Sequence, residues 1–298
     1  MGKHAYCIIA HNDRYCLEKL ISMLDNERHD IFILPDKKTS PDFESGIETK
    51  KSYLEILPKD KRVDVRWGHI SLVEAEITAI EAALKKDRYN YIHLISGVDL
   101  PIKSIDHIQN FFDSQFPDTL FVAVNENPDA VEEVFERVKY YNILTKYQKS
   151  SNRILKIASA LINKTGLILQ KSLGIKRDWK NYVVRKGSNW VTLSDEFARF
   201  LADRKKLILK KYRGIKCADE IFIQTEIMSS HFKEKLYRDS EGHTDHMRLI
   251  EFEGDSPRVF SISDYEELIQ SPDLFARKFS SQTDKSVIDR IFENSLTG

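Results

Sequence analysis

The sequence has no excess of either charge. Lysine plus arginine and aspartate plus glutamate each total 46 among 298 residues. No overall field therefore favours a nucleic acid or another polyanionic partner. We expect no nucleic-acid partner, and any electrostatic function must come from local clusters of charge.

Long apolar runs are also missing. No run approaches the ~20 apolar residues of a membrane span, and the apolar run near the start is too short for the core of a signal peptide. We expect a soluble, cytoplasmic enzyme, and 41% hydrophobic residues are enough to build a substantial core. Cys7, Cys16 and Cys217 are odd in number and lack metal-ligand spacing, which predicts plain thiols without a disulfide framework or zinc site.

Several enzyme motifs are absent. The sequence has no phosphate-binding G-x-x-x-x-G-K loop, no G-x-G-x-x-G, no G-x-S-x-G and no H-E-x-x-H. It also lacks the aspartate-x-aspartate pair at a strand end that holds a divalent metal in many nucleotide-sugar enzymes. The H-T-D-H run at 243–246 is typical of a polar surface loop, so we expect no metal site. A nucleotide-dependent reaction would need fixed cations instead.

The chain alternates between strand and helix patterns. Continuous or brief apolar runs predict strands at residues 6–10, 30–34, 63–66, 91–95, 120–124 and 190–193. Helical spacing predicts intervening helices, with Asn12 or Asp13 as the first cap, a capping box at Ser71 and Glu74, and a cap at Ser194. This alternation predicts an α/β fold with a Rossmann-like, mostly parallel central sheet and flanking helices.

Polar residues follow the predicted strands. Ligands in such folds bind at the carboxyl ends of the strands, where this chain carries His11, Asp36 and the S-G-V-D-L-P segment at 96–101. Ordinary turn formation is the alternative, because Asn, Asp, Gly and Pro also dominate loops.

The segment 146–177 contains no acidic residue. At helical pitch, Arg153, Lys156, Lys164 and Lys171 fall on one face and isoleucine and leucine side chains fall on another. Such a basic amphipathic helix usually packs its apolar face on a core, which is our expectation, and docking on a membrane surface is the alternative.

Four segments together resemble the core-2/I-branching family of β-1,6-N-acetylglucosaminyltransferases, which includes peptide O-xylosyltransferases. They are Y-I-H-L-I-S-G-V-D-L-P-I-K-S at 91–104, G-S-N-W-V-T-L at 187–193, D-E-I-F-I-Q-T at 219–225 and L-F-A-R-K-F at 274–279. The segments 8–12 and 34–38 also look like the first strands of that family, whereas 125–178 has no match. The resemblance implies one GT-A domain over 1–298, with a nucleotide-sugar-binding half at 1–124 and an acceptor-binding, catalytic half at 125–298.

The resemblance also implies inversion at the anomeric carbon without a metal. It places the catalytic carboxylate at Glu220, as the base that accepts a proton from the acceptor hydroxyl. If Asp219 caps a helix there, Glu220 lies in the first turn, where the helix dipole favours its carboxylate. Lys278 matches the lysine that contacts the donor diphosphate, with Arg258 as its nearest arginine partner and Arg248 as the alternative.

Further roles follow from the same resemblance. Asp36 would pair with uracil beside His11, and Trp67 would stack on the base, with core packing as the alternative for the tryptophan. Asp99 would order the donor pocket, or only its own turn. Trp190 would line the acceptor pocket, or pack in the core.

The expected reaction moves N-acetylglucosamine from its uridine diphosphate donor to the 6-hydroxyl of a glycan or lipid-linked glycan. Transfer of xylose or another sugar, and a non-catalytic nucleotide-sugar or glycan-binding module, are the alternatives. The sequence lacks the Golgi anchor, stem and disulfide cysteines of better-known family members, which fits a bacterial cytoplasmic enzyme. With a lipid-linked acceptor, the basic segment 146–177 would dock on anionic lipid.

Overall fold

The computed structural model describes residues 2–115, 117–254 and 256–296. The first part alternates strands and helices: β1 (His4–Ala10), α1 (Arg14–Leu24), β2 (His29–Pro35), β3 (Tyr53–Ile56), α2 (Ser71–Lys86), β4 (Tyr91–Ser96), β5 (Leu100–Pro101) and α3 (Ile105–Ser114). The remainder is mostly helical: α4 (Pro128–Val138), α5 (Arg153–Ser172), β6 (Val191–Ser194), α6 (Asp195–Asp203), α7 (Lys205–Tyr212), α8 (Phe222–Met228), β7 (Arg248–Ile250), β8 (Phe252–Glu253), β9 (Ser256–Pro257), α9 (Tyr265–Gln270), β10 (Phe275–Arg277) and α10 (Lys285–Ser295).

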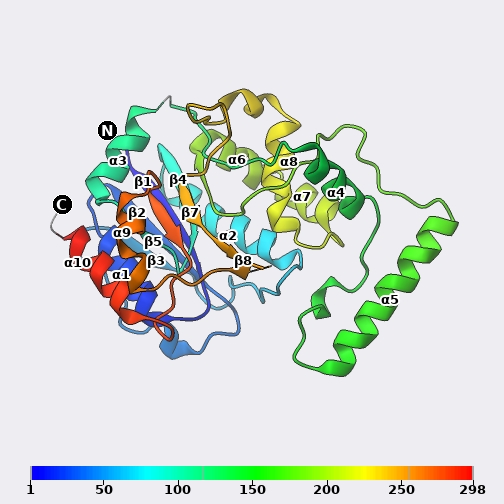
Figure 1. Cartoon of the computed structure of the whole chain (residues 1–298), viewed down its shortest axis with the longest axis horizontal. Helices are drawn as coiled ribbons and strands as arrows, with labels where there is room; N and C mark the ends of the chain where they lie inside the picture. Colours follow the sequence, from blue (N-terminus) through cyan, green and yellow to red (C-terminus); the bar gives the residue numbers. More distant parts are fainter. Residues whose placement is uncertain (1, 116, 255, 297–298) are drawn as a thin grey trace.

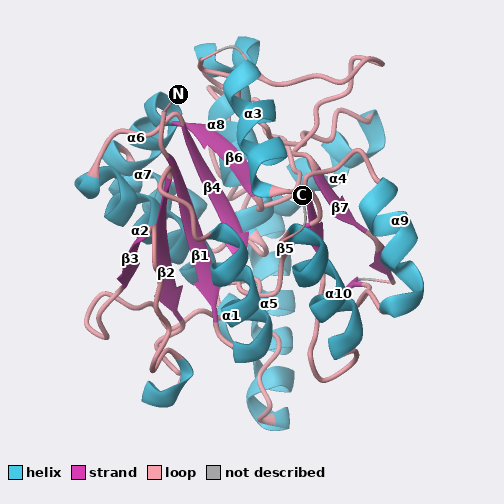
Figure 2. Cartoon of the chain, turned by 90° about the vertical axis from the view of Figure 1, so that its left-hand side faces the viewer, coloured by secondary structure: helices cyan, strands magenta, loops and turns pink. Residues whose placement is uncertain are grey.

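A five-stranded sheet forms the centre of the molecule (Figures 1 and 2). Its strand order is β3-β2-β1-β4-β6. The first four strands run parallel, and β6 pairs antiparallel with β4. With helices flanking this sheet, the predicted α/β class and mostly parallel arrangement are confirmed.

Burial on both faces explains why the central strands are mostly apolar. Every residue of β1 is buried. Cys7 and Ile9 belong to the apolar cluster that includes α2, whereas Tyr6 and Ile8 belong to the cluster that includes α1. Successive side chains of a strand point to opposite faces, so a strand covered on both sides needs no polar alternation.

Two predicted helix starts are confirmed. The Asp13 carboxylate accepts a hydrogen bond from the backbone N of Cys16 at 3.1 Å, and α1 begins at the next residue after Asp13. The Ser194 hydroxyl accepts from the backbone N of Phe197 at 3.4 Å and caps α6. Each cap satisfies one of the donors that the first turn of a helix leaves unpaired.

Other local predictions are wrong. Residues 63–66 form no strand, because the carbonyls of Val63 and Val65 accept from the backbone N of Lys37 (3.0 Å) and the ammonium of Lys38 (2.6 Å). The strand beside β2 is β3 instead. Ser71 does not cap α2, because its hydroxyl accepts from the backbone N of Arg66 in the preceding loop.

The segment 120–124 makes isolated pairings in place of the predicted strand. Leu120 bridges to Leu236, and Phe121 bridges antiparallel to Thr192. These pairings still bury the segment, since Leu120, Phe121 and Val122 are fully buried.

A second, three-stranded sheet carries the C-terminal part of the chain to the central sheet. Its order is β5-β10-β7. The backbone N of Ile102 donates to the carbonyl of Leu274 at 3.0 Å, and that of Phe279 donates to the carbonyl of Val98 at 3.0 Å. These bonds hold the end of β10 beside the turn that follows β4.

The predicted packing of the basic segment is wrong. Helix α5 extends at the edge of the molecule, on the right of Figure 1, away from the central sheet. Of its 20 residues, only Ser159 and Gln170 are buried, whereas Ile154 and Leu161 are 77% and 63% exposed. Its apolar face therefore packs on no core formed by the described residues.

Two composition-based expectations concern the cysteines and the membrane. All three cysteines are free thiols and all are buried, and burial raises the pKa of Cys217 to about 12. Among the described helices, none combines the length and the apolar character that crossing a bilayer requires.

Candidate functional site

The carboxyl ends of β1, β2 and β4 meet at one edge of the central sheet. His11 directly follows β1, and Asp36 directly follows β2. The backbone N of Asp36 donates to the carbonyl of Ala10 at 2.8 Å, and that of Gly97 donates to the carbonyl of Ile9 at 3.0 Å. These bonds hold the three strand ends in register and place their polar residues together.

Asp36 is a buried carboxylate at this edge. It accepts from the backbone N of Lys38 at 2.8 Å and from the Lys38 ammonium at 2.9 Å. The same ammonium contacts Asp64 at 2.8 Å. The group predicted to bind the nucleoside is therefore held in a fixed orientation.

His11 lies close to Asp36 and to the end of β10. Loss of water contact lowers the pKa of His11, and Lys278 and Arg277 lower it further, against the opposing effect of Asp36. The structure thus brings His11, Asp36 and Lys278 into one electrostatic neighbourhood, although they are far apart in the sequence.

A second group of contacts connects Asp99 with Trp190. Arg277 donates to the Asp99 carboxylate at 2.7 Å and also contacts the Ser96 hydroxyl. Its guanidinium lies 4.8 Å from the centre of the Trp190 ring. Trp190 is buried in the core, so its ring meets the site through Arg277. We call His11, Asp36, Asp99, Trp190, Arg277 and Lys278 the donor-edge cluster.

Lys278 follows β10 and is bonded through its backbone to the chain near Arg258. Its carbonyl accepts from the backbone N of Phe260 at 2.9 Å, and its own N donates to the Arg258 carbonyl at 3.4 Å. Within the described ranges, the Lys278 ammonium forms no ion pair. It is therefore available to an anionic ligand.

The two candidate arginine partners of Lys278 are both occupied. Arg258 forms ion pairs with Glu251 (2.7 Å) and Asp264 (3.0 Å). Arg248 is buried, donates to the carbonyl of Val191 at 2.8 Å and to the Thr192 hydroxyl at 3.0 Å, and burial lowers its pKa to about 10. Arg248 thus links β6 and β7 inside the core, which leaves Arg258 as the candidate nearer the surface.

We considered Asp219 as the cap of an α-helix that has Glu220 in its first turn. The structure has no such capped helix at Glu220. Asp219 and Glu220 belong to a single 3₁₀ turn, η3 (Ala218–Glu220), and α8 begins two residues later without a side-chain cap. The Glu220 carbonyl accepts from the backbone N of Gly187 at 2.9 Å. Its side chain is 45% exposed, and its Oε2 lies 3.3 Å from Arg137 Nη1 on α4.

The site also contains two buried acids, Asp219 and Glu76. Burial raises the pKa of Asp219 to about 7, with the Glu220 charge adding to the effect, and burial together with the Asp219 charge raises the pKa of Glu76. Asn189 donates to Glu76 at 3.1 Å. Asp219 Oδ1 and Glu76 Oε2 have no hydrogen-bond partner among the described residues. We call Glu76, Asp219 and Glu220 the carboxylate cluster.

Residues 187–190 connect the two clusters. Gly187 contacts Glu220, Asn189 contacts Glu76, and Trp190 faces Arg277. A side chain at position 187 would place its Cβ 1.9 Å from the Ala123 carbonyl oxygen, so glycine is required for this close approach. The G-S-N-W segment at 187–190 therefore contacts both clusters.

Trp67 belongs to the surface beside the carboxylate cluster. The ring is 48% exposed, so it is not a core aromatic, and the Lys149 ammonium lies 3.8 Å from its centre. The carbonyl of the next residue, Gly68, accepts from the backbone N of Cys217 at 3.1 Å. Trp67 is thus near Glu220, and Val65 connects its segment to Lys38 and Asp36.

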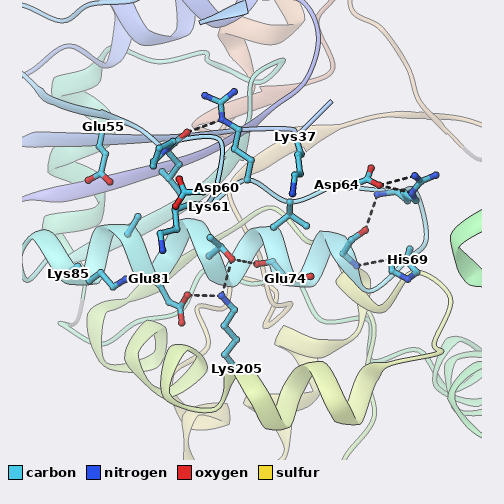
Figure 3. Close-up of a pocket in the computed structure, with 18 of the residues that line it drawn as sticks. Lys37, Glu55, Asp60, Lys61, Asp64, His69, Glu74, Glu81, Lys85 and Lys205 are labelled. Atoms are coloured by element: carbon cyan, nitrogen blue, oxygen red, sulfur yellow. Dashed lines mark hydrogen bonds and ion pairs between the residues drawn. The ribbon is translucent and has the colours of Figure 1, made fainter. Parts of the chain in front are cut away.

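A cavity of about 770 Å³ lies between residues of the loop 57–66 and α2 (Figure 3). None of the predicted site residues lines it. Two ion pairs lie along it: Lys205 contacts Glu81 at 2.6 Å, and Arg66 contacts Asp64 at 2.8 Å. Because the predicted site residues lie at the sheet edge and none lines this cavity, we place the candidate site at the sheet edge.

Sequence reasoning missed three residues of the site. Arg277 lies inside the L-F-A-R-K-F motif, so its position next to Lys278 was a usable signal. Glu76 shares the buried face of α2 with Val73 and Ile77, where an acidic residue is an anomaly. Arg137 lies in the segment without family resemblance, and no local pattern indicates its contact with Glu220.

Neither cluster forms a ready metal site. In the part of the chain that the structure describes, no group of three or more His, Cys, Asp or Glu side chains is arranged to hold an ion. Metal independence remains a prediction, which the experiments below test by chelation.

Replacing Asp219 by asparagine tests the burial of this acid. Because the pKa of Asp219 is raised from 3.8 to about 7 on folding, its bound proton stabilises the folded chain at low pH. That contribution is lost as the pH rises through about 7. Relative to Asp219→Asn, the wild type should lose stability between about pH 4 and pH 7, by up to about 4 kcal/mol.

Chemical denaturation across this pH range measures the difference. The exposed residue Asp60 provides the matched control, since Asp60→Asn should follow the wild-type pH profile. Parallel profiles for the wild type and Asp219→Asn would contradict the prediction.

Comparison with known proteins adds independent evidence. The sequence profile described as "Core-2/I-Branching enzyme" matches residues 4–268. A mouse (Mus musculus) protein, β-1,3-galactosyl-O-glycosyl-glycoprotein β-1,6-N-acetylglucosaminyltransferase 4, is 28% identical over 103 residues, which is 34% of this chain and 22% of that protein. The chain therefore matches less than a quarter of that relative's length.

Among solved structures, the galactosyltransferase LgtC with donor and acceptor sugar analogues is 9% identical, with a TM-score of 0.42 over 99% of this chain and 95% of that one. The bifunctional glycosyltransferase WbbM is 10% identical, with a TM-score of 0.33 over 76% of this chain and 37% of that one. Family membership rests on the profile, because it spans most of the chain. The protein belongs to the Core-2/I-Branching enzyme family.

Proposed function

We propose that this protein is an inverting, metal-independent glycosyltransferase with a GT-A fold, which transfers N-acetylglucosamine from its uridine diphosphate donor to the 6-hydroxyl of a glycan. Family membership supports a transferase, and the similarity to the mouse β-1,6-N-acetylglucosaminyltransferase supports this donor and linkage. The observation that carries the proposal is the placement of Glu220 and Lys278. The half-exposed carboxylate and the unpaired ammonium belong to clusters connected by residues 187–190.

In this mechanism Glu220 is the base. Its carboxylate accepts the proton of the acceptor hydroxyl while that oxygen attacks the anomeric carbon from the side opposite the diphosphate. The bond to the diphosphate breaks as the new glycosidic bond forms, which inverts the configuration. Arg137, 3.3 Å from Oε2, orients the carboxylate.

The donor-edge cluster receives the nucleotide. Asp36 and His11 contact the nucleoside, and the exposed ring of Trp67 stacks on the base. Lys278 stabilises the two negative charges that develop on the departing diphosphate, which is the role of the metal in other nucleotide-sugar enzymes. Arg258 joins it by exchanging Glu251 or Asp264 for a phosphate oxygen.

The acceptor side lies around Glu220. Trp190 shapes the pocket from within the core, and Asp99 holds Arg277 in place against its ring. The predicted cytoplasmic location adds no step to this mechanism and stays a prediction.

Release of uridine diphosphate tests the proposal. The purified chain is incubated in EDTA with a panel of uridine diphosphate sugars, and slow hydrolysis of each donor is followed without any added acceptor. We expect release from the N-acetylglucosamine donor above all others. The cavity residue Lys205, which pairs with Glu81, provides a control, because Lys205→Ala should retain the activity.

Each outcome bears on a different part of the proposal. Preferential release from a xylose donor would contradict the donor assignment. Activity only after manganese is restored would contradict metal independence. If the chain neither releases diphosphate from any donor nor measurably binds one, the proposed transferase activity itself is contradicted.

A further inference from the structure

The orientation of α5 is the reverse of that expected for a helix on the surface of a globular domain. Such helices turn their apolar stripe to the core and their polar face to water. Here polar side chains face the body: Gln170 exchanges hydrogen bonds with the backbone N (2.8 Å) and carbonyl (2.9 Å) of Tyr141, and Asn163 accepts from the backbone N of Leu144 at 3.0 Å. Ser159, on the same side, is buried.

The apolar stripe lies on the opposite side. At about 100° per residue, the directions of the exposed residues Ile154, Ile157, Leu161 and Ile168 fall within about 60° of one another. The centre of that group is about 180° from the centre of Ser159, Asn163 and Gln170. Further exposed apolar side chains widen the stripe or extend it past the helix end: Leu155, Ile162, Leu169, Leu173 and Ile175.

Basic residues border this stripe. Arg153, Lys164 and Lys171 lie along one edge of it, again by helical pitch. The whole segment 146–177 carries eight lysines and arginines and no acidic residue. A second copy of the chain would bring like charges together across such a face, whereas an anionic surface would complement them.

We propose that α5 is a membrane-docking helix that lies in the plane of an anionic phospholipid surface. The 20 residues of α5 are about 30 Å long, with the isoleucine and leucine side chains entering the acyl boundary and the bordering cations contacting phosphates. The helix lies on the bilayer without crossing it, since no described helix has the apolar character of a span.

The segment that carries α5 is joined to the candidate site. The backbone N of Asn142 donates to the carbonyl of Gly214 at 2.8 Å, six residues before Glu220. Lys149, four residues before α5, covers Trp67. Docking would therefore hold the candidate site at the membrane that carries lipid-linked acceptor glycans. This last step rests on the proposed function, whereas membrane docking does not.

Sedimentation with phospholipid vesicles tests docking independently of catalysis. The full chain should bind vesicles of phosphatidylcholine plus phosphatidylglycerol, and should bind much less to vesicles of phosphatidylcholine alone. Raising the ionic strength from about 0.1 M to about 1 M should weaken binding, because the Debye length falls from about 10 Å to about 3 Å. Equal binding to both vesicle types would overturn the charge argument.

Variants separate the two contributions. Combined Ile154→Ser, Leu161→Ser and Ile168→Ser should reduce binding at least about tenfold by removing buried apolar area. Each of Arg153→Gln, Lys164→Gln and Lys171→Gln should reduce it by about fivefold at low salt. Leu207→Ser on α7, with an equally exposed side chain, is the matched control and should bind as the wild type does.

Circular dichroism checks that the variants are folded. A fluorescent label reports whether α5 enters the bilayer. Because the three native cysteines are buried, Leu161→Cys can be labelled selectively with an environment-sensitive fluorophore. Its emission should shift to the blue on anionic vesicles, whereas a label at Lys206→Cys should not shift. No shift at position 161, or a concentration-dependent dimer abolished by the triple serine variant, would overturn the proposal.

Release of uridine diphosphate in the absence of vesicles remains the separate test of catalysis. If the chain releases uridine diphosphate but does not bind vesicles, docking is contradicted and the proposed function is not. Vesicle binding without any donor release or binding would leave docking supported and contradict the proposed function.

Discussion

Replacement of Glu220 by glutamine is expected to lower the rate of sugar transfer by about 10²- to 10⁴-fold, the usual contribution of a general base. Glutamine keeps the shape of the side chain but cannot accept the acceptor proton. Donor affinity should stay nearly unchanged, because the proposed mechanism places Glu220 against the acceptor and not against the nucleotide. Steady-state rates of diphosphate release and calorimetric titration of the donor measure the two quantities.

Glu133 provides the matched control for this variant. Its carboxylate lies 2.7 Å from the same Arg137 and is more exposed than that of Glu220. Glu133→Gln removes the charge of the other carboxylate on this arginine and should lower the rate far less than Glu220→Gln does. Unchanged transfer in Glu220→Gln, or an equal loss in both variants, would exclude Glu220 as the base.

Replacement of Lys278 by alanine should lower kcat by about 10²- to 10³-fold, as removal of one preorganised donor to a developing charge does elsewhere. The leaving diphosphate gains negative charge in the transition state, and Lys278 is the described cation of the donor-edge cluster without an ion pair. Lys278→Arg should restore part of the rate, because the charge is kept while its geometry changes.

The control for this variant is Lys285→Ala at the start of α10. That ammonium lies 4.3 Å from the centre of the Tyr15 ring, outside both clusters, and its loss should be neutral. Rates are compared in EDTA and with added manganese. A Lys278→Ala enzyme that keeps its rate in EDTA would show that other groups neutralise the diphosphate.

The central strands could be predicted because they are buried on both faces. β1, β2 and β4 therefore appear in the sequence as mostly apolar runs, although β2 contains Asp30 and β4 contains His93, both buried. β3 is a short edge strand with partly exposed residues and Glu55 in its middle, so it carries no such pattern. Val63 and Val65 pack on the core as strand residues would, but their carbonyls accept hydrogen bonds from Lys37 and Lys38.

The residues of the site likewise fall into those that the sequence could predict and those that it could not. Residues placed by strand ends and family motifs, such as Asp36 and Lys278, were found in the sequence. Arg137 was not, because its contact with Glu220 joins residues 83 positions apart and no short motif marks it.

Helix α5 shows a different limit. Its amphipathic pattern is the same whether the apolar stripe faces inward or outward, so periodicity predicts the helix but not its direction. The direction depends on the polar contacts of Asn163 and Gln170 with the body of the protein, which only the folded chain reveals.

The antiparallel bridge between Phe121 and Thr192 closes the base of a long excursion of the chain. Everything from α4 through α5 departs from and returns to this one point beside β4. Loop-closure entropy rises only slowly with loop length, by about 0.6 kcal/mol per doubling. Chain added to the exposed part of this excursion, around α5, would leave the central sheet in register. The segment that carries α5 can thus change in length at little entropic cost, whereas the strands that hold Asp36 and Lys278 lie outside it.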